Sequence, residues 1–140
     1  MDSVSLLKAQ VHEAHQVAGG TVADLTADQA HWAPGGKAHN IGALYTHLVA
    51  AEDLFLNMMT GRQPLAMGAF TGKTGASEPH PTGDYGDWAQ RVKVNLPQLS
   101  EYAQAGFKGT EDYVASLKPE DLDRELDLTS AGMGKMSLGS

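Results

Sequence analysis

Residues 40–61, NIGALYTHLVAAEDLFLNMMTG, carry the pattern that decides the fold. Their apolar side chains recur at alternating steps of three and four residues, which predicts an amphipathic helix with one face in a core. Asn40 is a favourable N-cap, and Gly61 can adopt the left-handed conformation that ends a helix. His47 lies beside the predicted core-facing stripe, which consists of Ile41, Leu44, Leu48, Ala51, Phe55 and Met58.

A second amphipathic helix is expected at the N-terminus, from Ser3, a plausible cap, to about Leu25. Gly19 and Gly20 fall inside this segment. Each glycine costs about 1 kcal/mol relative to alanine in a helix interior. The pair therefore predicts either a bend or a close approach of another group to the backbone.

Two connections flank residues 40–61. Before them, Thr26 and Gln29 fit a capping box, which predicts a further helical turn ending near His31. After them, residues 61–86 are rich in Gly, Pro, Ser and Thr and show no periodicity. A loop of this length is unusual in a compact domain unless it covers something or crosses the end of a bundle.

The last helical region is divided by Pro97, which cannot sit in a helix interior without removing a hydrogen bond. We expect a short helix up to about Asn95 and a longer one from Pro97 to about Leu117, with the proline at a kink or in the first turn. Residues 119–122 predict a turn, and ELDL at 125–128 predicts an extended segment. Ser137 before Leu138 resembles the start of another helix.

Three amphipathic helices with wide apolar stripes need a fourth to close an ordinary four-helix bundle. Either the given sequence stops before the last helix, or a partner chain covers the exposed seam, or the domain is a three-helix structure. If the 140 residues are complete, the uncovered stripe predicts a homodimer or a larger assembly.

Composition narrows the functional class. A chain of 140 residues with 41% hydrophobic residues fits a single domain spanning residues 1–140. The formal charge of −7 argues against nucleic acid as a partner. No apolar run is long enough for a membrane span and no signal peptide is recognisable, which predicts a soluble cytoplasmic protein. Because cysteine is absent, a metal would need nitrogen and oxygen ligands, and thiol chemistry would need a thiol from a small molecule.

Two segments resemble the DinB-like superfamily, whose members are four-helix proteins. The first is LTADQAHWAPGGKAHNIGALYTHLVAAED at residues 25–53, where an LTxxQxxWxP motif leads into the helix that carries His47. The second is SLKPEDLDRELDL at residues 116–128, followed by MSLG. The resemblance covers nearly all of the chain and implies an all-α, DinB-like four-helix bundle with its last helix missing or cut short.

The resemblance also implies a function. In the family, a divalent metal, typically nickel or zinc, is held by a histidine on the second helix and by two residues four apart on the last helix. His47 matches the first ligand, and the other two have no counterpart before Ser140. The implied activity is that of a metal-dependent thiol transferase or isomerase that uses a low-molecular-weight thiol. The alternative is a non-catalytic, stress-associated bundle that binds a small molecule or a partner.

Each remaining candidate site residue has both a structural and a functional interpretation. His47 is either a metal ligand or a half-buried histidine whose ring nitrogens bond to backbone or water. His15 could join His47 and a loop residue in one site if Gly19 and Gly20 leave a hollow there. Otherwise we expect solvated roles for His12, His15, His31, His39, His80, Glu52 and Asp53. We expect packing roles for Trp32, Trp88, Tyr102 and Tyr113.

Overall fold

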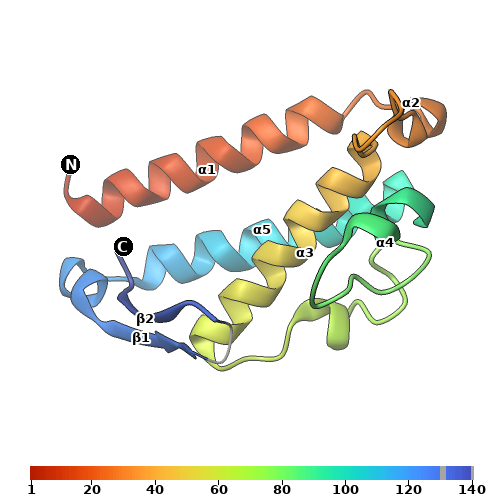
Figure 1. Cartoon of the computed structure of the whole chain (residues 1–140). Helices are drawn as coiled ribbons and strands as arrows, with labels where there is room; N and C mark the ends of the chain where they lie inside the picture. Colours follow the sequence, from red (N-terminus) through yellow and green to blue (C-terminus); the bar gives the residue numbers. More distant parts are fainter. Residues whose placement is uncertain (130–131, 140) are drawn as a thin grey trace.

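The computed structural model describes residues 1–129 and 132–139. Three long helices dominate it, and a small antiparallel hairpin follows the last of them (Figure 1). The elements in chain order are α1 (Ser3–Val22), α2 (Ala27–His31), α3 (Ile41–Thr60), η1 (Leu65–Met67), α4 (Gly86–Arg91), α5 (Leu96–Ser116), η2 (Pro119–Asp123), β1 (Glu125–Leu128) and β2 (Gly134–Ser137).

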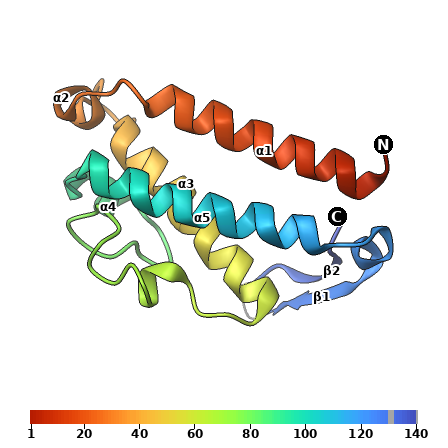
Figure 2. The ribbon, with the colours of Figure 1, turned by 180° about the vertical axis from the view of Figure 1, so that it is seen from behind.

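Helix α5 is the central element, because both α1 and α3 pack on it. Figures 1 and 2 show α1 running antiparallel to α5, whereas α3 crosses α5 and runs in the same general direction. Because α3 and α5 run in the same general direction, the chain must return along the length of α3 before α5 begins. That length is roughly 30 Å for 20 residues. Residues 61–95 make this return, which explains the long connection that the sequence predicts.

The helix boundaries follow from capping groups. Asn40 accepts a hydrogen bond from the Ala43 amide at 2.8 Å, and Gly61 adopts φ 66°, so both predicted ends of α3 are confirmed. The capping box that begins α2 is also present. At α1 the prediction was wrong by one residue: Asp2, not Ser3, is the cap, because its carboxylate accepts from the Ser5 amide at 2.7 Å.

Helix α1 is continuous through Gly19 and Gly20 and ends at Val22, three residues before the predicted end. Helix α4 ends at Arg91, short of the predicted Asn95. Asn95 instead caps α5. Pro97 therefore lies in the first turn of α5, which is one of the two positions that we predicted for it.

The core forms where α3 and α5 meet the return segment. One buried cluster joins α3 to α5 and the strand-like residues before it, and a second joins α3 to α4. The Ala76–Val94 bridge pins the return segment against the start of α5. The two clusters consist of Val49, Val94, Leu99, Tyr102 and Ala103, and of Ala43, Trp88, Ala89 and Val92.

The predicted core-facing stripe of α3 was wrong for its largest members. Leu44, Leu48 and Phe55 are 43%, 46% and 40% exposed. The buried face carries smaller and polar residues instead, among them Thr46 and Asp53, because α5 and the return segment both approach that side. The exposed residues lie on the side that the described elements leave open. Among the described residues, no helix is long and apolar enough to cross a membrane.

The chain after α5 forms a hairpin rather than a helix. The extended segment ELDL is confirmed as β1, and β2 pairs with it antiparallel, with Glu125 opposite Ser137. The expected helix start at Ser137 was wrong. The reason is that the ladder continues past it: the Leu138 amide donates to the Arg124 carbonyl at 2.9 Å, and the Gly139 amide donates to the Leu122 carbonyl at 2.9 Å.

Candidate functional site

His47 forms a pair with a histidine from the return segment. Its Nδ1 lies 2.7 Å from Nε2 of His80, and the two rings are stacked with centroids 4.9 Å apart. His47 comes from the middle of α3, and His80 comes from a Pro-His-Pro sequence that precedes α4. The fold therefore brings together two imidazoles that lie 33 residues apart.

Aromatic rings form the walls around this pair. Tyr85 stacks on His47 with centroids 4.0 Å apart, and Trp88 presents an edge-to-face contact to His80 at 4.9 Å. His39 also contacts Tyr85, at 5.5 Å, and its Nδ1 is buried without a hydrogen-bond partner in the described structure. Three imidazoles thus surround one phenol ring.

The surroundings of His80 favour its neutral form. Burial lowers the pKa of His80, and the nearby His47 lowers it further. Two rings joined by one N–H···N hydrogen bond need at least one unprotonated nitrogen. Since neutral imidazole nitrogen is also the form that binds metals, the pair is suited to a metal as well as to a proton.

The fit of a divalent metal to this pair is partial. Two nitrogens on one tetrahedral zinc lie roughly 3.3 Å apart, given Zn–N bonds of about 2.0–2.1 Å. The observed 2.7 Å separation could reach that value by a small rotation of the rings. The chemistry of the donors fits nickel or zinc, but the described residues contain no group of three or more histidines and carboxylates able to hold a metal. The described residues supply two candidate ligands here, His47 and His80.

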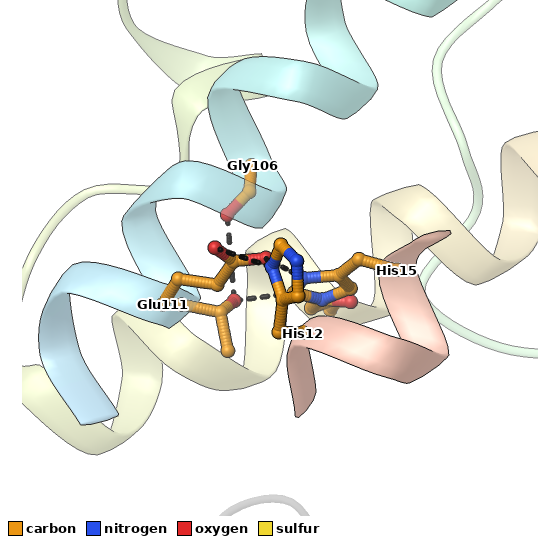
Figure 3. A network of polar contacts seen from close by, with 6 residues as sticks. His12, His15, Gly106 and Glu111 are labelled. Carbon is orange, nitrogen blue, oxygen red and sulfur yellow. Dashed lines mark hydrogen bonds and ion pairs between the residues drawn. The ribbon is translucent and has the colours of Figure 1, made fainter. Parts of the chain in front are cut away.

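A second histidine lies in a different environment, shown in Figure 3. His15 of α1 is buried, with 9% exposure, between two carboxylates. Its Nδ1 lies 2.8 Å from Glu111 of α5, and its Nε2 lies 2.9 Å from Glu52 of α3. Each ring nitrogen of His15 has a carboxylate partner from a different helix. His15 therefore ties all three long helices together.

Neighbouring groups complete this network. Thr110 bonds to Glu52, and its hydroxyl also lies 3.3 Å from the Gly106 carbonyl. His12 lies 3.4 Å from Glu111 at the exposed edge. The hydrogen bond from His15 lowers the pKa of Glu111, and the one from His12 adds to this effect, so Glu111 is ionised at neutral pH.

Comparison with known proteins identifies the family. Residues 10–140 match the family described as the DinB superfamily. The chain belongs to the DinB superfamily. No curated protein matches it significantly. Among solved structures, the crystal structure of a conserved protein from Enterococcus faecalis superposes with a TM-score of 0.77 at 24% identity, and the match covers 99% of this chain and 84% of that one. The likeness to that structure concerns the fold alone.

Within this DinB-superfamily chain, the hypothesis of a joint site of His47, His15 and a loop residue needs correction. His47 does meet a loop residue, but His15 belongs to the separate carboxylate network. A groove does lie beside Gly19 and Gly20, but His15 lines it and His47 does not, so the prediction of a hollow beside His47 was wrong. Whether His47 is a metal ligand stays a prediction.

Several solvated roles predicted from the sequence were wrong. Asp53 is 2% exposed and accepts hydrogen bonds from the Tyr102 hydroxyl at 2.8 Å and from the Leu65 and Ala66 amides at 2.8 and 3.0 Å. These bonds satisfy a buried charge and anchor η1 to α3. Burial and Asp53 raise the pKa of Tyr102.

His31 was also expected to be exposed, yet its Nε2 accepts from the Val94 amide at 2.9 Å. His39 and His80 are half-buried around Tyr85. Trp88 and Tyr102 pack as predicted, but Trp32 is 68% exposed. The sequence offered no spacing signal for the His47–His80 pair, because the loop path depends on the parallel arrangement of α3 and α5.

Proposed function

We propose that this protein binds a divalent metal, nickel or zinc, through His47 and His80, and uses it in a thiol-dependent transferase or isomerase reaction. The observation that carries the proposal is the 2.7 Å approach of the two ring nitrogens. Membership of the DinB superfamily supports it. In the sequence, His47 matches the place where we expect the metal-binding histidine of the second helix in that family.

The chain's own residues would act by binding and by excluding water. His47 and His80 would supply two nitrogen ligands, and the rings of Tyr85 and Trp88 would shield one side of the site. A bound divalent cation would supply the charge that lowers the pKa of a coordinated small-molecule thiol. The absence of cysteine fits a thiol supplied from outside, and we place the activity in the cytoplasm, where such thiols are abundant.

Isothermal titration with zinc and nickel chloride tests the metal site. We expect saturable binding to the wild type that weakens at least about tenfold in His47→Ala and in His80→Ala, as loss of a ligand should produce. His12→Ala is the matched control, because His12 is an exposed imidazole outside the pair and should leave the affinity within about twofold. Equal affinities in all four proteins would reject the site.

A second measurement separates thiol chemistry from metal binding alone. The ultraviolet absorbance of thiolate, recorded against pH with 2-mercaptoethanol and zinc-loaded protein, should show a lowered pKa of the bound thiol. His80→Ala, tested at the same zinc concentration, should reduce the effect. Metal binding without any change in the thiol titration would support the non-catalytic alternative.

One observation favours that alternative. Catalytic zinc sites usually have three protein ligands, and the described residues provide two at this position. In this second candidate function the bundle would bind a small molecule or a partner, in a stress-associated role, without catalysis.

We also propose that the protein forms a homodimer through the exposed apolar face of α3. Leu44, Leu48 and Phe55 lie on this face, where burial against a second copy would remove apolar area from water. Light scattering at micromolar concentration should give twice the mass of 14.8 kDa for the wild type. Leu48→Glu should give a monomer, whereas the control Val17→Glu, which alters an exposed apolar residue of α1, should remain dimeric.

A further inference from the structure

A groove of about 980 Å³ lies between α1 and α5, separate from the His47–His80 pair. Its apolar walls include Leu99, Ala103 and Phe107 from α5, with Tyr45 of α3 among the residues that line it. This volume is at the upper end of the range for small-molecule sites. A second, smaller hollow of about 290 Å³ lies on the other side of Glu111, which lines both.

The two glycines of α1 border the larger hollow. A Cβ atom built on Gly19 or Gly20 would meet no described heavy atom within 4 Å. Packing therefore does not require glycine at either position, although each lowers helix stability. Gly19 lies one helical turn after His15, so both residues face the same side of α1.

The polar end of the groove is acidic. Glu111 is ionised, its side chain is 35% exposed, and it is one of the residues that line the groove. Lys108, the cation that also lines the groove, is paired with Asp112 at 2.5 Å. His15 lies between Glu111 and Glu52, so two carboxylates meet at this end of the groove.

We propose that the groove binds an amphipathic organic cation, with its ammonium group at Glu111 and its apolar body along Phe107 and the backbone of Gly19 and Gly20. Charge complementarity selects the head group, because an ammonium gains a charge-assisted hydrogen bond where a carboxylate would meet repulsion. The open glycines admit the apolar body close to the α1 backbone.

Three probes with one tail and different head groups test the proposal: n-decylammonium, n-decanol and n-decanoate, each below its micelle concentration. Titration calorimetry should give saturable one-to-one binding of decylammonium, at least roughly tenfold tighter than decanoate. Amide chemical shifts should move at Gly19 and Gly20. Gly19→Leu should abolish binding of decylammonium and decanol without unfolding the protein, because the new side chain enters open space.

Matched variants separate the contribution of the ligand's head group to binding from the contribution of its tail. Glu111→Gln should remove the preference for ammonium over alcohol, whereas Glu101→Gln, the same change at an exposed position of α5, should preserve it. Ala9→Leu, on the exposed side of α1, should leave binding unchanged and so controls for Gly19→Leu. Three results would each overturn the proposal: equal affinity for decylammonium and decanoate, chemical-shift changes confined to the exposed α3 face, or a dimer that occludes Gly19 and binds no probe.

Discussion

His15 and His47 are both partly or fully buried histidines on long helices, yet their partners differ in kind. Both nitrogens of His15 face carboxylates, whereas Nδ1 of His47 faces another imidazole. In the described part of the chain, neither His47 nor His80 forms an ion pair. Burial alone therefore does not define what a histidine does; its hydrogen-bonding partners do.

The difference separates a structural role for His15 from the binding role that we propose for His47 and His80. The network of His15 has no spare ring nitrogen, so its value lies in joining α1, α3 and α5. The His47–His80 pair shares a single hydrogen bond and is held by aromatic contacts, and in our proposal a divalent cation replaces the proton of that bond. We therefore expect substitutions at the two places to act on different properties.

The largest expected effect is on stability at His15. His15→Ala should lower the free energy of unfolding by about 2–3 kcal/mol, because it removes two charge-assisted hydrogen bonds and leaves Glu52 and Glu111 facing each other. It also removes the ring that stacks on Phe107 at 4.1 Å. Urea unfolding measures this loss. His12→Ala, at the exposed edge, should change stability by less than about 0.5 kcal/mol, and an equal loss in both variants would contradict the distinction.

The next effect concerns pH and His80. Its pKa is lowered in the folded protein, chiefly by burial, whereas the unfolded chain titrates near 6.5. As pH falls below 6.5, the unfolded state takes up a proton that folded His80 does not, so stability falls until the folded pKa is reached. Unfolding measured at pH 7.5 and 5.0 should show a smaller loss in His80→Gln than in the wild type.

The interval between pH 7.5 and pH 5.0 separates the effect of His80 on stability from that of Glu111. The lowered pKa of Glu111 contributes stability above its unfolded value of 4.5, and this is lost only at more acidic pH. His12→Gln provides the control for a histidine change outside the pair. If His80→Gln retains the full wild-type pH dependence, His80 does not account for it.

The comparison also shows what sequence could predict. Caps, turns and breakers are local, so both ends of α3, the α2 capping box, the position of Pro97 and the extended ELDL segment were predictable. The all-α class and the family followed from these signals. The partners of His15 lie 37 and 96 residues away, and no local spacing encodes them.

The error at the α3 stripe has a physical cause. Apolar periodicity identifies the more hydrophobic face of a helix, and the prediction assumed that this face is the buried one. Here the buried face contains Asp53, whose charge is satisfied by four hydrogen-bond donors from three elements of the fold. A single sequence shows an acidic residue at that position and gives no sign of those donors.

The smallest effect tests the hollow beside His15. Gly19→Ala should raise the free energy of unfolding by about 0.5–1 kcal/mol, because alanine favours the helix and its methyl group meets open space. Gly42→Ala is the matched contrast within α3: its Cβ would lie 2.9 Å from the Ala30 carbonyl oxygen, so it should destabilise the protein. Zinc affinity at His47 should be unchanged in Gly19→Ala, since the groove and the histidine pair are separate. If Gly19→Ala destabilised the protein instead, the hollow would be filled in solution, and His15 would belong to a tighter interface than its present partners indicate.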